Sequence, residues 1–416
     1  MEPSLKKAKV GNSIANDGKL EGGDDANVAC PNLPAGIHRN VLGHLPVTAL
    51  LAARPVCKQW KLAPEKIIAS RCKGTGNIAT NEDLRKLVHS YATCKCPPEK
   101  REEFNLSNHQ AELTIENIAI QHGHPIRKWS ASKATDFSHI FGNEDLEEFN
   151  ESLAEWDVSS ATNMPSMFYG CCKFNQDLSN WQTSHVETMC RMFGGASTFN
   201  GDITQWQTFR VTGMSEMFHS ATNFNQDISH WDTSQVRDMT LMFARAATFN
   251  QDISTWNVAN VEAIHCMFSK AVSFGQDLNS WGTFNVRDMT HVFANCTSFN
   301  RCLSHWGTSN VVSMNGMFIH AKAFNQDLSK WDTSNVTCMC NMFNGAEAFN
   351  GNVSKWNIAN VTSFHAMFAG TKALLDVDLS NWVLTDQPRM NCKRMFHGSN
   401  IPKHHLPRYV PLAWFA

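Results

Sequence analysis

Hydrophobic residues recur along most of this chain with one fixed period. Tryptophan stands at every twenty-fifth position from Trp156 to Trp356. One phenylalanine precedes each of these tryptophans by seven residues and another follows by twelve, as Phe149 and Phe168 do for Trp156. A period of about 20–50 residues indicates a solenoid, whose units bury their apolar edges only by stacking on one another. The sequence therefore predicts a stack of about ten full units plus caps.

The second half of each unit predicts a helical turn. The unit reads F-N-x-D-[I/L]-S-x-W-x-T-S-x-V-x-x-M-x-x-M-F-x-x-A-x-x. In the unit that begins at Phe224, the apolar residues of this half are Val236, Met239, Met242, Phe243 and Ala246. Their spacing places them on one helical face.

The first half, Phe224 to Trp231, predicts a short strand, because Ile228 stands alone between polar neighbours. One strand and one helical or 3₁₀ segment per unit is the leucine-rich-repeat plan. The expected fold class is an α/β solenoid of short parallel strands and helical turns, with a sheet about 50 Å long. Tryptophan, phenylalanine and methionine would stack inside it. The 3 tyrosines against 26 phenylalanines fit a core that excludes hydroxyl groups.

Two polar columns accompany the apolar ones. The asparagine column holds Asn175, Asn200, Asn225, Asn250, Asn300, Asn325 and Asn350. The aspartate column holds Asp177, Asp202, Asp227, Asp252, Asp277 and Asp327. Repeated aspartates can bind calcium in β-rolls, but such rolls need glycine-rich turns, of which this unit has few. We therefore expect both columns to cap backbone groups at the turns of each coil.

This unit closely resembles the repeat of the BspA-like leucine-rich-repeat family, which reads F-N-x-D-[I/L]-S-x-W-D-x-S-x-V-x-x-M-x-x-M-F. The resemblance covers residues 122–398 and implies a fold for protein–protein contact rather than catalysis. Trp129 and Phe141 mark a degenerate first unit, and Leu375 stands where the last phenylalanine is expected. Atypical units are common at solenoid ends. We expect residues 399–416 to be a C-terminal cap or tail.

Residues 31–72 have a different pattern, which predicts a small all-α domain. Apolar residues at helical spacing from Leu33 to Leu45 predict a first helix, with Pro34 in its first turn and Pro46 after its end.

The flanking segments carry little apolar pattern. Residues 1–30 are rich in Gly, Asp, Lys and Asn, which predicts a disordered tail. Residues 73–121 form a linker to the repeats, with one predicted helix from Asp83 to Ala92.

The 31–72 segment resembles an F-box, whose motif begins with L-P, continues with I-L-x-x-L-P and ends with L-L-x-x-R-x-V-C-K-x-W. Gly36 and Ala49 depart from it, since acidic residues are common at both positions. The resemblance implies docking onto a Skp-type adaptor of a cullin–RING ubiquitin ligase. The implied docking residues are Leu33, Pro34, Ile37, Leu42, Leu45, Pro46, Leu50, Leu51, Val56 and Trp60. The alternative is a small helical cap on the solenoid.

The amino-acid composition and the missing motifs disfavour several classes of function. Lys and Arg number 36 against 38 Asp and Glu, which disfavours nucleic-acid binding because phosphates need clustered cations. No apolar run suits a transmembrane helix and no secretory signal is visible, so we expect no membrane partner and an intracellular location, cytoplasmic or nuclear. The 14 cysteines are then expected to stay reduced. No catalytic, phosphate-binding or metal-binding motif is present, so no enzyme activity, metal or cofactor is expected.

Binding residues are expected where the repeat varies. The residue before each tryptophan changes from unit to unit and includes His230, His305, Lys330 and Lys355. Adjacent coils would place these in a ridge on the sheet face. Phe209 and Phe284 replace serine or alanine three residues after tryptophan, and an exposed ring in a polar column can anchor a partner. The alternative is that each ring is tucked against the next coil.

The two resemblances together suggest an adaptor without chemistry of its own. The F-box-like segment would hold the Skp-type adaptor and its cullin scaffold, and the repeats would capture an unknown protein substrate for ubiquitination. The alternative is a BspA-like surface or adhesion repeat protein with no role in ubiquitination.

Overall fold

The computed structural model describes a few positions between 110 and 121 and the ranges 78–95, 126–142, 146–384 and 390–408. The chain divides into two units, Met1–Ile67 and Ile68–Ala416, and every described residue belongs to the second. The predicted tail and the F-box-like segment lie outside the described residues.

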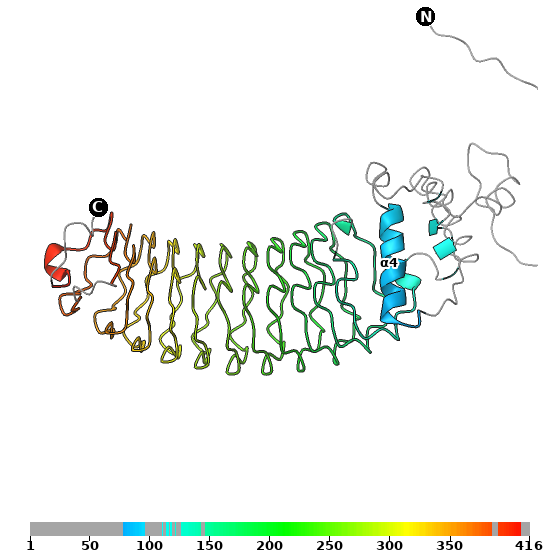
Figure 1. Ribbon diagram of the computed structural model, residues 1–416, viewed down its shortest axis with the longest axis horizontal. Helices are drawn as coiled ribbons and strands as arrows, with labels where there is room; N and C mark the ends of the chain where they lie inside the picture. The colour runs from blue at the N-terminus through cyan, green and yellow to red at the C-terminus, as the bar shows by residue number, and fades with distance from the viewer. Residues whose placement is uncertain are drawn as a thin grey trace, which may run out of the picture. The chain divides into compact units, whose positions relative to one another are not determined.

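The described part of the second unit is a stack of coils, seen side by side in Figure 1. Each coil is made of tight turns, closed by hydrogen bonds from a backbone N–H to the carbonyl three residues earlier. In one coil the donors are Trp206, Val211, Met217, His219, Ala221 and Phe224. No α-helix occurs in the coils between residues 146 and 384, so the predicted helical turn, and with it the α/β class, is wrong.

A backbone ladder joins neighbouring coils in the second half of the unit. Alternate N–H groups point to the next coil, as in the bond from Met214 to the Asp238 carbonyl (3.0 Å). One residue per coil forms a parallel bridge, and the bridges run without a break from Asp136 to Asn391. The predicted solenoid with parallel pairing is confirmed, but the pairing lies in the half that the sequence assigns to a helix.

Backbone conformation explains why a helical spacing gives no helix. Glu216 and Ser220 have positive φ angles of 55° and 59°, and the equivalent positions of the other coils share this conformation. A left-handed residue reverses the local direction of the chain, so the flanking N–H groups point to the next coil instead of four residues back. Apolar residues still point inward at every third or fourth position, because each turn spans that many residues.

The core consists of aromatic and methionine columns that run through the stack. The Phe193 ring stacks on Phe199 with centroids 3.8 Å apart and on Phe218 of the next coil at 5.8 Å. Trp181 and Trp206 lie 6.1 Å apart and nearly parallel. All of these side chains are buried. The columns predicted from the period are therefore confirmed.

Most indole N–H groups reach a backbone acceptor at the edge of this core. Trp206 Nε1–H donates to the Leu178 carbonyl of the preceding coil (3.0 Å), and the pattern repeats in most coils. Trp231 and Trp382 lack such a partner. The tryptophan column thus carries its polar atom where the neighbouring backbone can accept its hydrogen.

The asparagine and aspartate columns bind backbone, as predicted. Asn200 Oδ1 accepts a hydrogen bond from the N–H of Asn225 in the next coil (2.9 Å). Asp227 Oδ1 accepts from the N–H of Ser229 (3.0 Å), which closes an Asx turn, and this bond lowers the pKa of the Asp227 carboxyl. All six aspartates of the column close the same turn. The capping interpretation is confirmed.

Helix α4 (Asn81–Lys95) lies at the N-terminal end of the stack (Figure 1) and confirms the linker helix predicted from the sequence. It begins after Thr80, whose hydroxyl accepts a hydrogen bond from the N–H of Asp83 (3.1 Å). Its buried face includes Tyr91, whose ring meets the Trp129 ring edge-on at 5.5 Å. The helix therefore closes the core of the first coil.

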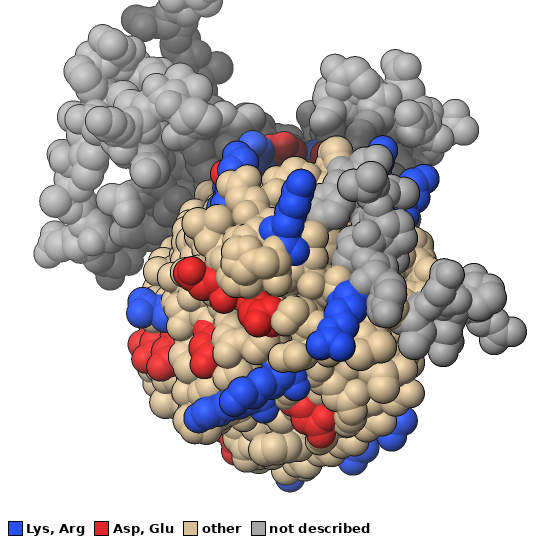
Figure 2. All heavy atoms as spheres, turned by 90° about the vertical axis from the view of Figure 1, so that its left-hand side faces the viewer, with Lys and Arg blue, Asp and Glu red and all other residues tan. Residues whose placement is uncertain are grey.

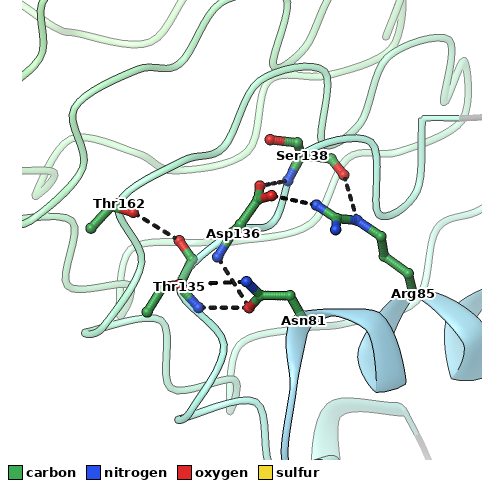
Figure 3. Close-up of polar contacts among 6 residues, drawn as sticks. All are labelled: Asn81, Arg85, Thr135, Asp136, Ser138 and Thr162. Carbon is green, nitrogen blue, oxygen red and sulfur yellow. Dashed lines mark hydrogen bonds and ion pairs between the residues drawn. The ribbon is translucent and has the colours of Figure 1, made fainter.

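Polar contacts fix α4 to that coil (Figure 3). Asn81 Oδ1 accepts hydrogen bonds from the N–H groups of Thr135 (2.9 Å) and Asp136 (3.3 Å). Arg85 pairs with the Asp136 carboxylate (2.6 Å) and donates to the Ser138 carbonyl (3.5 Å). Side chains of α4 thus provide the first coil with the hydrogen-bond acceptor and donor that a preceding coil would otherwise provide.

The last coil contains one extra residue. Leu374 is fully buried in the phenylalanine column, whereas Leu375 is 50% exposed, so the expectation that Leu375 replaces phenylalanine is wrong. Asn350 Oδ1 accepts hydrogen bonds from the N–H groups of both Leu375 and Asp376, which accommodates the insertion before Trp382.

Short 3₁₀ segments occur near both ends of the stack. The segment η2 (Ile126–Lys128) begins the first coil with Ile126 buried. The segment η4 (Lys403–His405) follows the last coil, and Arg408 then pairs with Val383 through one parallel bridge.

Candidate binding surface

Phe209 and Phe284 are large rings at an otherwise small position. The other repeats between residues 159 and 359 carry serine or alanine there. Phe209 is 45% exposed and Phe284 is 59% exposed. Covering such rings would remove apolar surface from water, so both are suitable anchors for a partner.

The Phe284 ring packs against the next coil and also remains largely exposed. Its ring lies over Gly307 of the next coil, where a Cβ atom would come within 2.2 Å of it. A Cβ atom at Gly282, in its own coil, would lie 3.4 Å from the ring. The same position is polar, never glycine, in the other repeats between residues 182 and 357. Only the glycine at 307 is required, because a Cβ there would overlap the ring; the ring therefore rests against the next coil before any partner arrives.

Each exposed ring coincides with a change of turn chemistry. In a regular repeat, Asp232 Oδ1 accepts a hydrogen bond from the N–H of Ser234 (2.9 Å), and Asn257 does the same for Ala259 (3.1 Å). The capping position is Gln207 before Phe209 and Gly282 before Phe284. Neither residue closes an Asx turn. The cap is also absent at Gln182 and Gly307, where serine follows at the small position, so its loss alone does not distinguish the two coils with exposed rings.

The surface beside Phe209 is hollowed. An open hollow of ≈ 390 Å³ is lined by Glu187, Phe209, Arg210, Thr212 and Gln235. It combines one apolar wall with a carboxylate, a guanidinium and neutral polar groups. Such a mixture suits the side chain of a peptide better than a purely apolar ligand.

The residues before each tryptophan form a ridge. It does not lie on the ladder face, the face that carries the bridged residues such as Gly213 and Asp238. His230, His305, Lys330 and Lys355 are all exposed. Each lies in the turn that precedes its tryptophan, whereas the bridged residues come after the next turn. Neighbouring coils contact each other along this ridge, as in the 2.8 Å contact between Asn279 Nδ2 and His305 Nδ1. The expected ridge therefore exists, and its predicted location on the sheet face is wrong.

The ladder face was missed by sequence reasoning. Between the two methionines of each unit, the first residue points out of the ladder and varies widely. From residue 190 onward this column holds Cys190, Ser215, Thr240, His265, Thr290, Asn315, Cys340 and His365. The sequence contained a signal for this face, because apolar residues, mostly methionine, flank these variable positions. Assigning this half to a helix concealed that the variable residues share one face.

Charges on this face are mixed rather than of one sign. Arg191 and Glu216 form an ion pair at 2.6 Å between neighbouring coils, both partly exposed. Burial lowers the pKa of His219 and of His291, so these imidazoles favour the neutral form. At the C-terminal end of the stack, Figure 2 likewise shows basic and acidic side chains interspersed. None of these observations favours a polyanionic partner.

Two buried cysteines are part of the core. Cys171 and Cys296 fill the small slot usually held by alanine, and burial raises the pKa of both thiols. Within the described ranges no group of three metal-binding side chains comes together. No helix among the described residues has the length and apolar character needed to cross a membrane.

The predicted adaptor-docking residues cannot be placed on this surface. All ten, from Leu33 to Trp60, lie outside the described residues. Their role therefore stays a prediction from the sequence.

These features define a repeat protein: a solenoid built of turns, with a constant core and a variable surface. The chain belongs to the family described as "Mycoplasma protein of unknown function, DUF285", whose model matches residues 110–211, 200–306 and 287–409. No curated protein matches the chain. Among solved structures, "Crystal structure of TLR13-ssRNA13 complex" is similar over 65% of this chain and 42% of that chain, with 11% identity and a TM-score of 0.25. This chain thus spans less than half of that protein, and the similarity adds nothing to the architecture described above.

Proposed function

We propose that this protein is a non-catalytic, protein-binding repeat protein that uses the side of the solenoid bearing Phe209 and Phe284. One observation carries the proposal. Two coils carry an exposed ring where the other repeats carry serine or alanine, and Gly307 of the next coil leaves the space that the Phe284 ring occupies. A change that contributes nothing to the core and exposes apolar surface is best explained by a partner that covers it.

The test compares the parent chain with a Phe209→Ser, Phe284→Ser double variant. Serine is the regular residue of this column, so the variant should fold like the parent. Each chain is used to capture proteins from extracts of its own source cells, and the captured proteins are quantified. We expect recovery of the specific partner to fall more than about tenfold, as for loss of interface anchors.

The matched control is Val272→Ser, which removes an exposed apolar side chain (40% exposed) from another column. It should leave recovery unchanged. Equal recovery by the parent chain and the double variant would contradict this location of the binding surface.

A more specific form of the proposal is a ubiquitin-ligase adaptor. The observation that favours it is the F-box-like pattern of residues 31–72, which precedes the repeats in the sequence. In this form the segment binds a Skp-type adaptor on a cullin scaffold inside the cell, and the solenoid brings a protein substrate to the ligase. The family assignment covers residues 110–409 and not this segment, so it supports the repeat-protein proposal, including a BspA-like surface or adhesion role, more than the ligase.

The two forms separate in one experiment. A purified Skp-type adaptor is mixed with the full chain, with Leu50→Ala and Trp60→Ala variants, and with a Lys66→Ala control outside the motif. The adaptor form predicts binding by the parent and the control and loss in both variants. No binding by the parent excludes it. A fluorescent fusion found on the cell surface would then favour the adhesion form.

A further inference from the structure

Two thiols lie side by side on the ladder face in the C-terminal half of the solenoid. Cys338 occupies the bridged position of its coil and Cys340 stands two residues later. Successive side chains in an extended segment alternate, so residues two apart point the same way. Their Sγ atoms are 3.3 Å apart, and both residues are only partly buried and not disulfide-bonded.

The surroundings distinguish the two sulfurs. The Cys338 thiol donates a hydrogen bond to Cys340 Sγ, and Cys340 Sγ lies 2.8 Å from Ser363 Oγ in the next coil. A serine hydroxyl can turn to donate as well as accept. Cys340 Sγ therefore has hydrogen-bonding partners on two sides, Cys338 in its own coil and Ser363 in the next. Burial raises the pKa of Cys338 above that of a free cysteine, which suits Cys338 to the second step rather than the first.

We propose that Cys338 and Cys340 are a redox-active thiol pair that forms a reversible intramolecular disulfide by exchange with a small-molecule disulfide such as glutathione disulfide. The Cys340 thiolate attacks one sulfur of the reagent, forming a mixed disulfide and releasing one small thiolate. Cys338 then loses its proton and attacks Cys340 Sγ, which releases the second small thiolate. Two electrons and two protons pass from the pair to the reagent, which becomes two thiols.

The geometry requires only a small movement for the second step. The sulfurs must approach from 3.3 Å to about 2.0 Å, a change that side-chain rotation can supply. The flanking backbone is tied on both sides, through bonds from Gly316 N–H to the Cys340 carbonyl (2.7 Å) and from Met339 N–H to the Ser363 carbonyl (2.9 Å). The ladder thus holds the pair together in its reduced state. It also resists distortion by the small ring that the disulfide closes, which makes the disulfide easy to reduce.

The chain contains its own control. Cys190 occupies the same column as Cys340, but the position two residues earlier is Thr188, whose hydroxyl lies 3.4 Å from Cys190 Sγ. Cys190 can form a mixed disulfide with the reagent but has no second thiol beside it. The proposal therefore predicts different products at two positions with the same place in the coil.

The experiment exposes the full chain to mixtures of oxidised and reduced glutathione, followed by alkylation, trypsin and mass spectrometry. The tryptic peptide of residues 331–355 contains Cys338 and Cys340 and no other cysteine, and that of residues 174–191 contains Cys190 alone. We expect the first peptide to lose both alkylation sites without retaining glutathione, and to recover them after treatment with dithiothreitol. The second peptide should carry glutathione or remain alkylated.

Single-cysteine variants test the order of the steps. Cys338→Ser should trap glutathione on Cys340, whereas Cys340→Ser should react more slowly than Cys338→Ser, because burial raises the pKa of the thiol that remains. Two results would overturn the proposal: a 331–355 peptide that stays doubly alkylated at every ratio, or one that retains glutathione without passing on to the disulfide. The first measurement uses the parent chain, so the proposal stays testable if a variant fails to fold.

Discussion

The core and the ladder face of this solenoid follow opposite rules. Inside, almost every coil has the same side chain at the same position, as in the tryptophan and phenylalanine columns. On the ladder face, the backbone is the same in every coil while the side chains differ, even at positions with positive φ. The comparison shows that side chains define the stack from inside, and that backbone hydrogen bonds keep the outer face regular whatever residues it carries.

The largest expected effect comes from breaking a core column. Phe243→Ala removes a fully buried ring that stacks on Phe249 at 4.0 Å and on Phe268 at 5.8 Å. We expect a loss of about 3–5 kcal/mol in unfolding free energy. Urea unfolding followed by tryptophan fluorescence would measure it. Phe284→Ala, a surface ring, should change stability by no more than about 0.5 kcal/mol. Equal losses would mean that the core and the surface are not energetically distinct.

A smaller effect is expected from the asparagine column, which belongs to neither region. Asn250→Ala removes the acceptor of the Gly275 N–H (2.9 Å) and should cost about 1 kcal/mol. Asn250→Asp keeps an acceptor at the same place and should recover most of this loss. Thermal unfolding of the three chains would show it. If alanine and aspartate behaved alike, the side-chain ladder would not contribute to stability.

On the ladder face, glycine is expected to give a more stable protein than alanine at a position with positive φ. Leu241 has a positive φ of 57°, which is strained for a residue with a β-carbon. Both Leu241→Gly and Leu241→Ala remove the side chain, but only glycine relieves the backbone. The glycine variant should be the more stable of the two by about 1 kcal/mol. The same pair of substitutions at the adjacent core residue Met242 should show no such advantage for glycine.

The smallest effect per site concerns pH. The N–H of Ser229 and the N–H of Ser254 lower the pKa of Asp227 and Asp252, respectively. A carboxyl with a lowered folded-state pKa stabilises the fold above its unfolded pKa of about 3.9. This contribution disappears as the pH falls through the lower folded value.

Melting temperatures measured from pH 5 downward should therefore fall less steeply for an Asp227→Asn, Asp252→Asn variant than for the parent. Asparagine keeps the turn without titrating, as the bond from Ser354 N–H to Asn352 Oδ1 (3.0 Å) shows. Identical pH profiles would assign the acid sensitivity to other groups.

The sequence predicted what the core requires and not how the backbone meets that requirement. The 25-residue period alone identified the buried columns and the caps made by Asn200 and Asp227, because each depends on residue type at a fixed position. The strand and the helical turn were misplaced, because spacings of three and four residues arise from successive tight turns as well as from a helix. The left-handed conformation of residues such as Glu216 leaves no mark in composition, since many residue types occupy it here.

On the candidate surface, too, the sequence predicted some features and only the structure shows the others. Phe209 and Phe284 were recognisable as exceptions within a column, and the structure adds that Gly307 leaves the space for the Phe284 ring. The ladder face could not be found while its residues were assigned to a helix. The contact between Cys338 and Cys340 depends on that face and was visible only in three dimensions.

Most ladder bonds run in one direction, which makes the two ends of the stack chemically unlike. In one coil the N–H groups of Met214, Glu216, Phe218 and Ser220 donate to the following coil, whereas fewer, such as that of Thr212, donate to the preceding one. The first coil therefore faces outward mainly with carbonyl oxygens, and the final coil mainly with hydrogen-bond donors. Arg85, which donates to the Ser138 carbonyl, suits the first end and would be the wrong cap for the other. A shortened chain that starts at an internal coil would need a donor-bearing cap of its own, whereas one that stops early would need acceptors. Exchanging the two caps should therefore leave both ends unsatisfied.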